Sequence, residues 1–245
     1  MGPRKPMVPR AGEGLYQLAQ AFQPSRRLKY VFVHIPKTAG TSFLRGFIQP
    51  HEPHFKYAGH AWKEPQRVRG WGSWMDPSRA EQWDWLPGYG HHLAKGKPAI
   101  SIVRNPFDLL VSYYFHGAVE KNHLGWANVI NIHGFRSFRE FILAYCDPNF
   151  TWHLPALKQR LFGQLFDSSG VCLASLIIRQ EELAEGLRQF ARLHEMADPE
   201  TLPAVRPSLS REFEDYRFYY DSEMVELLTR KLHPDLEAFD YAFES

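Results

Sequence analysis

Three short apolar runs along the chain predict the strands of a central sheet. They cover residues 30–35, 99–103 and 171–178. Each run is mostly apolar rather than alternating with polar residues, which is typical of parallel strands covered on both faces. A helical pattern follows each run, so we expect right-handed strand–helix–strand units. The chain is therefore predicted to be an α/β protein of three layers, with its functional site at the carboxyl ends of the strands.

Capping signals mark where two of the helices begin. Asn105 is an N-cap residue, and Pro106 follows at the first helical position, where its missing N–H has no helical partner to lose. After the third run, apolar residues recur at helical spacing: Leu183, Leu187 and Phe190. Glu181 and Glu182 fall in the first turn of that helix, where the helix dipole favours acidic side chains.

The loop after the first run is the most informative stretch of the chain. Residues 34–42 spell His-Ile-Pro-Lys-Thr-Ala-Gly-Thr-Ser, between a buried strand and an amphipathic helix. Such a loop offers backbone N–H groups, hydroxyl donors and a lysine to an anionic ligand. Gly40 lets the backbone approach an oxyanion, and Lys37 supplies positive charge where a leaving group gains negative charge. In a Walker A loop the lysine follows the last glycine, whereas here it precedes Gly40, so an ordinary P-loop kinase is disfavoured.

A second polar motif begins where the second run ends, at Arg104. Counting from the N-cap at about 100° per residue places Asp108, Ser112 and His116 on one face of the following helix. The opposite face is apolar and carries Phe107, Leu110, Val111, Tyr114 and Ala118. An arginine fork with a serine hydroxyl suits a terminal phosphate. The alternative is a capped helix with a solvated polar face.

Composition narrows the class of partners. The 245 residues are 44% apolar and 15% aromatic, enough for a substantial core, and the net charge of +2 disfavours a nucleic-acid binder. The two cysteines, Cys146 and Cys172, form neither a disulfide framework nor a zinc pattern, which fits a reducing compartment. No apolar run approaches the roughly 20 residues that span a membrane. We expect a soluble, cytoplasmic protein. A protein from which a membrane anchor had been trimmed would show the same features.

The chain is predicted to form an N-terminal arm at residues 1–27 and a single domain at 28–245. That domain contains an aperiodic insertion around 62–96 with five tryptophans: Trp62, Trp71, Trp74, Trp83 and Trp85. Long irregular insertions in compact domains are often binding loops or lids. The alternative is that these tryptophans form small satellite cores that anchor a long loop.

Together the two polar motifs resemble those of the sulfotransferase superfamily that uses 3′-phosphoadenosine-5′-phosphosulfate (PAPS). Residues 34–42 resemble its 5′-phosphosulfate loop, and residues 103–112 resemble its 3′-phosphate motif. The most similar branch contains carbohydrate sulfotransferases, such as heparan sulfate 2-O-sulfotransferase, and bacterial relatives. Weaker similarities extend the resemblance to residues 28–243; they lie at 178–183, 215–221 and 239–241. The resemblance implies a P-loop-like nucleotide-binding topology.

The resemblance also implies roles for particular residues. Lys37 would contact the phosphosulfate near its bridging oxygen and stabilise the charge that leaves with the nucleotide. Five residues would hold the 5′-phosphate through backbone and hydroxyl groups: Thr38, Ala39, Gly40, Thr41 and Ser42. Arg104 and Ser112 would bind the 3′-phosphate, which distinguishes PAPS from ATP. Ser208 and Arg211 lie in a basic segment that we expect to close over the nucleotide.

Sulfuryl transfer to a hydroxyl also needs a base that removes the proton of the acceptor. Family members often place a Gly-His pair before the 3′-phosphate strand, and His60 and His91 both follow a glycine in this region. His91 lies closer to Arg104 along the chain than we expect, and His60 lies farther away. We favour His60, because the tryptophan-rich insertion accounts for its extra distance. His34 is expected to orient the turn.

The predicted function is sulfuryl transfer from PAPS to a hydroxyl of a small molecule or saccharide by in-line displacement, without a metal. The product of the donor is 3′-phosphoadenosine-5′-phosphate (PAP). One alternative is a P-loop-like phosphotransferase that uses ATP and Mg²⁺, and another is a nucleotide-binding module without a base. A local basic rim could bind an anionic acceptor: Arg67, Arg69, Arg79, Lys95 and Lys97. The mild net charge disfavours a highly sulfated polyanion as the main acceptor, and the oligomeric state has no signal in the sequence.

Overall fold

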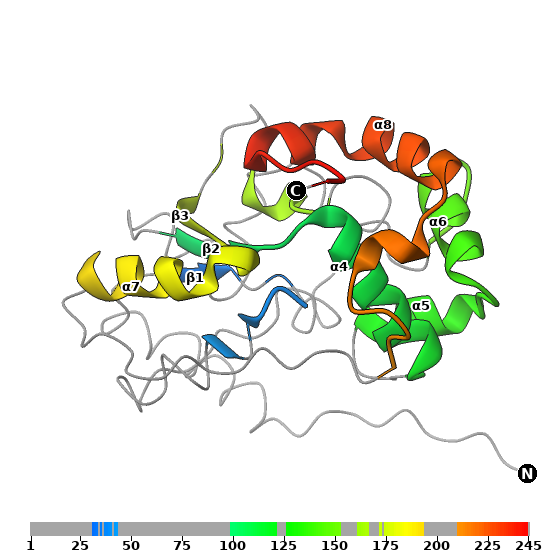
Figure 1. Ribbon diagram of the computed structural model, residues 1–245, viewed down its shortest axis with the longest axis horizontal. Helices are drawn as coiled ribbons and strands as arrows, with labels where there is room; N and C mark the ends of the chain where they lie inside the picture. The colour runs from blue at the N-terminus through cyan, green and yellow to red at the C-terminus, as the bar shows by residue number, and fades with distance from the viewer. Residues whose placement is uncertain are drawn as a thin grey trace, which may run out of the picture.

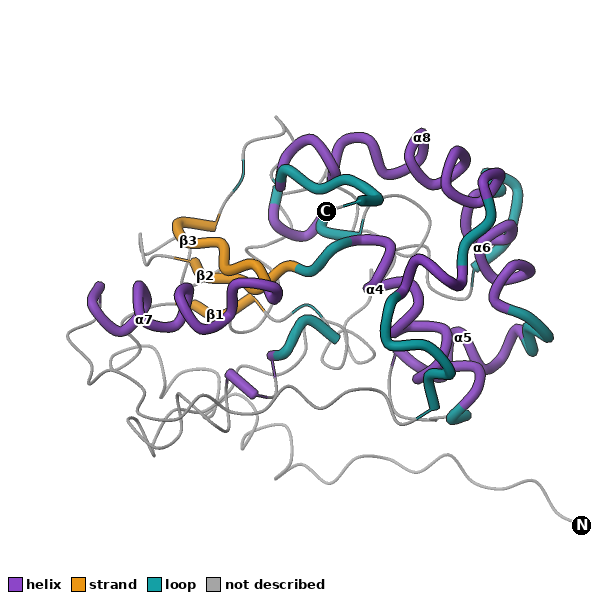
Figure 2. The backbone as a smooth tube through the Cα atoms, in the orientation of Figure 1, coloured by secondary structure: helices purple, strands orange, loops and turns teal. Residues whose placement is uncertain are grey.

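The computed structural model describes residues 31–33, 35, 37–40, 42–43, 99–121, 126–152, 161–166, 172, 174–193 and 210–244. The predicted arm at 1–27 and the tryptophan-rich insertion at 62–96 lie outside these residues, and both stay predictions. Within the described residues the chain combines a small sheet with helices on both of its faces (Figures 1 and 2).

Three parallel strands form the sheet in the order β1-β2-β3, with β1 at Val31–Val33, β2 at Ala99–Val103 and β3 at Ala174–Arg179. Val33 pairs with Ser101 and Val103 with Arg179, so the chain leaves the three strands at one edge of the sheet. The buried Ser101 hydroxyl donates to the Val33 carbonyl at 2.8 Å and adds a side-chain link between β1 and β2. The predicted parallel strands and the α/β class are therefore confirmed.

Helices make up most of the described chain outside the sheet. α4 (Pro106–Tyr114) continues directly into a π-helical turn, η5 (Phe115–Val119). The other helices are α5 (Trp126–His133), α6 (Phe138–Cys146), α7 (Leu183–Leu193) and α8 (Ser222–Phe239). Short 3₁₀ turns are η7 (Gly163–Leu165), η8 (Gln180–Glu182) and η9 (Tyr216–Tyr219). In the part of the chain that the structure describes, none of the helices is long and apolar enough to cross a membrane.

Side-chain caps explain why several helices begin where they do. The Asn105 side chain accepts from the Phe107 N–H at 3.0 Å, with proline at the next position, as the sequence predicts. Ser137 caps α6 by accepting from the Glu140 N–H at 3.1 Å. Asp221 does the same for α8. Each cap satisfies a backbone donor that has no partner inside its helix.

Two apolar cores cover the two faces of the sheet. Ile100 and Ile102 alternate along β2 and pack with α7, whereas Val103 belongs to a larger core that includes residues of α4, α6 and α8. In Figure 1, α7 lies alongside the strands, and α4, α5, α6 and α8 form a separate group. The residues predicted to form the apolar face of α7 are all buried: Leu183, Leu187 and Phe190. Burial on both faces explains why the strand sequences are mostly apolar.

α4 is buried on nearly every side. Its buried residues include Ser112, which is only 2% exposed although it lies on the predicted polar face. Asp108, one turn earlier, keeps a side-chain exposure of 18%. The alternative of a capped helix with a solvated polar face is therefore excluded, because this face is covered by other parts of the chain.

Gly186 is predicted to be required for the contact between α7 and β3. A Cβ atom at this position would overlap Ile178 Cγ2. We expect Gly186→Ala to lower the free energy of unfolding by about 1–3 kcal/mol through overpacking, even though alanine favours a helix by roughly 1 kcal/mol. Urea denaturation measures the change, and Gln189→Ala, at an exposed position of α7, should stay within about 0.5 kcal/mol of the wild type. A more stable Gly186→Ala protein would contradict the close approach.

Candidate active site

The loop after β1 has a strained backbone. Lys37 and Ala39 both have left-handed conformations, with φ of 64° and 61°. Each costs a residue with a Cβ roughly 1–2 kcal/mol, and such strain persists where the surrounding structure enforces it, often at functional sites. The Thr38 hydroxyl, fully buried, donates to the Ile35 carbonyl at 2.8 Å and holds the loop in this shape. Left-handed residues in a loop turn neighbouring N–H groups toward one concavity, which is one way to bind an anion.

A helical turn starts directly after this loop. The Phe43 N–H donates to the Ala39 carbonyl at 3.0 Å, and Phe43 is fully buried beside Phe190 of α7. The loop is therefore fixed at one end by β1 and at the other by the smaller core. For the described residues of this stretch, the order of strand, strained loop and helical turn agrees with the arrangement that the sequence predicts.

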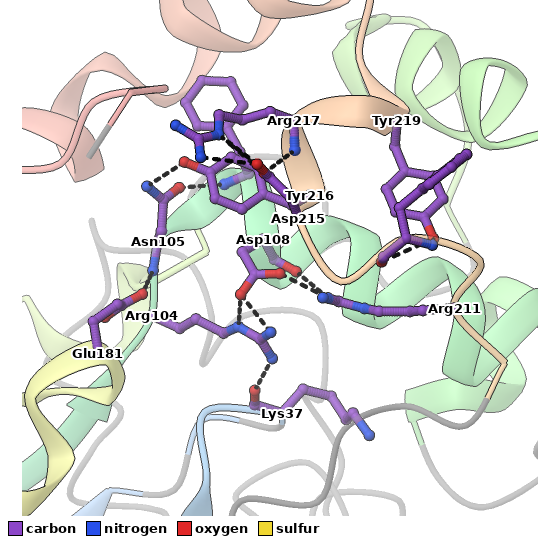
Figure 3. A network of polar contacts seen from close by, with 12 residues as sticks. Lys37, Arg104, Asn105, Asp108, Glu181, Arg211, Asp215, Tyr216, Arg217 and Tyr219 are labelled. Atoms are coloured by element: carbon purple, nitrogen blue, oxygen red, sulfur yellow. Dashed lines mark hydrogen bonds and ion pairs between the residues drawn. The ribbon is translucent and has the colours of Figure 1, made fainter.

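Arg104 connects the end of β2 to the loop. Its Nε donates to Asp108 Oδ2 at 2.6 Å, and one of its terminal nitrogens donates to the Lys37 carbonyl at 3.1 Å (Figure 3). The Arg104 side chain is only 12% exposed. Burial lowers the pKa of Arg104 and Asp108 raises it again, and an arginine remains charged under such opposing effects. A buried positive charge thus lies next to the strained loop.

Arg211, from a distant part of the chain, also binds the Asp108 carboxylate. Its terminal nitrogen pairs with Asp108 Oδ1 at 2.7 Å and donates to the Asp108 carbonyl at 3.0 Å. Figure 3 shows Arg104 and Arg211 approaching Asp108 from two sides. The Arg211 side chain is 10% exposed, and its buried Nε has no hydrogen-bond partner among the described residues. Two arginines on one carboxylate leave a net positive charge, together with a donor that meets no acceptor in the part of the chain that the structure describes.

Lys37 adds a third cation to this region. In Figure 3 its side chain extends away from Arg104, and its ammonium group points away from Asp108. Burial lowers the pKa of Lys37, Glu120 raises it, and the positive charges of Arg104 and Arg211 lower it further. The chemistry that these groups offer is the binding of a ligand with several negative charges.

Hydrogen bonds of Asn105 and Glu181 connect the chain segments next to Arg104. The Asn105 N–H donates to Glu181 Oε1 at 2.7 Å, and its side-chain nitrogen donates to the Ala242 carbonyl at 2.9 Å. The Tyr241 hydroxyl donates to Glu181 Oε2 at 2.8 Å. These bonds join the end of β2, the turn after β3 and the C-terminal segment. They also show that Glu181, expected only to favour a helix dipole, has specific distant partners.

The structure places eight of the predicted site residues: Lys37, Thr38, Ala39, Gly40, Ser42, Arg104, Ser112 and Arg211. Four others lie outside the described residues and stay predictions: Thr41, His60, His91 and Ser208. The structure brings Lys37, Arg104 and Arg211 together, and Ser112 is buried in α4 beyond Asp108. Since Thr38 donates its hydroxyl proton to the loop, the contact predicted for Thr38 would have to come from its backbone N–H.

Sequence reasoning missed the role of Asp108 as the carboxylate between the two arginines. The available signal was its spacing from Arg104, because residues four apart on a helix can pair. No comparable signal linked Asp108 to Arg211.

The fold and the site define an α/β protein with a strained loop and a buried arginine pair suited to a multiply charged anion. A model described as the sulfotransferase family matches residues 20–242 of the chain. No curated protein and no solved structure gives a significant match. Because the family match covers most of its length, the chain belongs to the sulfotransferase family. The family predicted from the two motifs is thereby confirmed.

Proposed function

We propose that this protein transfers a sulfuryl group from PAPS to a hydroxyl group of a small molecule or saccharide. Membership of the sulfotransferase family supports sulfuryl transfer in general. The observation that carries the choice of donor is the pair of buried arginines on Asp108 beside the strained loop of Lys37. The proposal includes a single domain at residues 28–245 with a P-loop-like, three-layer topology.

The residues at the site fit the two charged ends of PAPS. Arg211 Nε, which has no partner among the described residues, would bind the 3′-phosphate together with Ser112. Arg104 would add the terminal N–H groups that its bonds to Asp108 and the Lys37 carbonyl leave over. The backbone N–H groups of the loop would hold the 5′-phosphate, with Thr41 and Ser42 at its helical end. Ser208 would close over the nucleotide with Arg211.

The proposed reaction is an in-line displacement at sulfur. The acceptor oxygen forms a bond to sulfur while the bond from sulfur to the bridging oxygen of PAPS breaks. The electron pair of that bond leaves with PAP, and the ammonium of Lys37 stabilises the charge that develops there. A base takes the hydroxyl proton, and His60 and His91 remain the candidates that the sequence predicts.

A phosphotransferase that uses ATP is less well supported. Such an enzyme needs an acidic residue at a strand end to hold Mg²⁺, but β2 leads into Arg104 and β3 ends at Arg179. Across the described ranges, no three His, Cys, Asp or Glu side chains come together in a group that could hold a metal ion. A nucleotide-binding module without catalysis shares the same site, and only a transfer assay separates it from an enzyme.

Calorimetric titration with PAP and with ATP tests the proposal. We expect PAP to bind at least about 30-fold more tightly than ATP, because ATP lacks the 3′-phosphate and with it charged hydrogen bonds worth roughly 2 kcal/mol or more in total. Titration at two salt concentrations checks that the preference is electrostatic, since high salt should weaken PAP binding more. Equal affinities, or a preference for ATP with Mg²⁺, would contradict the proposed donor.

A further inference from the structure

A histidine and a glutamate form a pair where α4 passes into η5. His116 Nδ1 lies 2.9 Å from Glu120 Oε2, and the side chains are 22% and 32% exposed. The Glu120 N–H donates to the Phe115 carbonyl at 2.8 Å, a π-helical bond. π-Helical turns inside longer helices are frequent at functional sites, where they change the register of the side chains that follow.

The partner of His116 Nδ1 determines which ring nitrogen carries the proton. A carboxylate only accepts hydrogen bonds, so Nδ1 must donate and carry the proton of the neutral ring. Nε2 is then the unprotonated nitrogen, and it is the one able to take up a proton. A carboxylate on the other nitrogen also fixes the orientation of the ring and raises its basicity.

This pair lies close to both Lys37 and the segment that carries Arg211. The Ser210 hydroxyl donates to Glu120 Oε1 at 2.7 Å. The next residue, Arg211, binds Asp108, which lies near the start of α4. The segment at 210–211 therefore bridges the arginine pair and the His116–Glu120 pair. Lys37 is close enough for its charge to affect His116, and Glu120 in turn affects Lys37.

We propose that His116 is the general base that removes the acceptor proton, and that Glu120 is the residue that positions it. This inference rests on the proposed sulfuryl transfer. As the acceptor oxygen bonds to sulfur, its proton moves to His116 Nε2, and the electron pair of the broken sulfur–oxygen bond leaves with PAP beside Lys37. The imidazolium then returns the proton to solvent. His60 and His91 are the rival bases.

The protonation state of His116 suits this role. Burial and the positive charge of Lys37 lower its pKa, and Glu120 raises it again. The net result is a pKa below the ordinary value of about 6.5, so the ring is mostly neutral at pH 7. Among the described residues, the charged groups that act on the ring are Glu120, one turn further along the chain, and Lys37 from the loop after β1. Transfer should therefore fall in acid as His116 takes up a proton.

The test compares His116→Gln and Glu120→Gln with a matched pair on α8. His233 and Glu237 have the same spacing, but their side chains are 71% and 75% exposed. In full-length protein, conversion of PAPS to PAP should fall about 100-fold or more in His116→Gln, while PAP affinity measured by calorimetry stays within about threefold. His233→Gln should change neither quantity.

A second readout follows His116 itself by NMR titration in the PAP complex. The imidazole pKa should fall in Glu120→Gln, where the carboxylate charge is lost, and rise in Lys37→Met, where the ammonium charge is lost. The midpoint of the acid limb of turnover should move down with the pKa in Glu120→Gln. A purely structural role for Glu120 would not move these values in opposite directions in the two variants.

The outcomes separate the two proposals. A wild-type protein that neither binds PAP nor consumes PAPS overturns the proposed function. A wild-type protein that binds and turns over, with unchanged turnover in His116→Gln, overturns the present inference, as does a loss confined to His60→Gln or His91→Gln. An imidazole pKa that responds to neither Glu120→Gln nor Lys37→Met overturns it whatever the turnover.

Discussion

Replacing Lys37 by alanine is expected to reduce conversion of PAPS to PAP by at least about 100-fold, with the fold preserved. Removal of one group that stabilises developing charge in a dry site costs roughly 100- to 1,000-fold in rate. Lys37 belongs to the strained loop and is partly buried, close enough to two arginines to feel their charge, so water replaces its charge poorly. Single-turnover assays with saturating PAPS measure the chemical step apart from binding.

Lys121 offers a matched control for this experiment. It is also a lysine with a left-handed backbone, at φ of 47°, but it is exposed. Lys121→Ala therefore repeats the change of side chain on the same kind of backbone outside the site, and it should leave turnover unchanged. Lys37→Met, which keeps much of the length without the charge, should be as inactive as Lys37→Ala. An unchanged rate in both Lys37 variants would exclude the role given to this residue.

Replacing Arg104 by alanine is expected to weaken PAP binding by about 100-fold or more and to leave ATP binding nearly unchanged. Losing a buried charged hydrogen-bond donor costs roughly 2–5 kcal/mol, and only PAP presents a 3′-phosphate to it. The variant also releases the bonds from Arg104 to Asp108 and to the Lys37 carbonyl. Calorimetry with both nucleotides measures the loss of discrimination.

Two further variants sharpen the test of Arg104. Arg104→Lys keeps a positive charge but not the planar fork, so we expect it to recover only part of the PAP affinity. Arg139 is a suitable control, because it also pairs with two carboxylates, Asp221 and Glu223, but is 44% exposed. Arg139→Ala should leave PAP affinity unchanged. Unchanged PAP affinity in Arg104→Ala would contradict the 3′-phosphate contact proposed for Arg104 and would indicate that this site binds a different ligand.

The sequence predicted the local elements of the fold well. The apolar runs identified all three described strands, and the Asn105-Pro106 pair marked the start of α4. These features depend on residues close together in the chain, where burial and capping leave a readable pattern. β1 is shorter than the predicted strand and ends before Ile35. The Ile35 carbonyl accepts a hydrogen bond from the Thr38 hydroxyl and so belongs to the loop.

The family could also be predicted from the sequence, for a related reason. The loop at residues 34–42 and the motif at residues 103–112 are each contiguous, and each is at the end of a strand. Their order and spacing could therefore be compared with a known pattern. The match to the sulfotransferase family over residues 20–242 agrees with that comparison. The acceptor has no such contiguous signal, and its class remains part of the proposal.

What the sequence determined by itself, then, was where the strands and helices lie and which short motifs follow them. Only the tertiary structure decided that Asp108 binds Arg211 as well as Arg104, and that Glu181 joins Asn105 to Tyr241. Only the fold, likewise, buried the polar face of α4 instead of leaving it solvated. The physical reason is that partners far apart along the chain are selected by packing, which imposes no period or spacing on the residues between them.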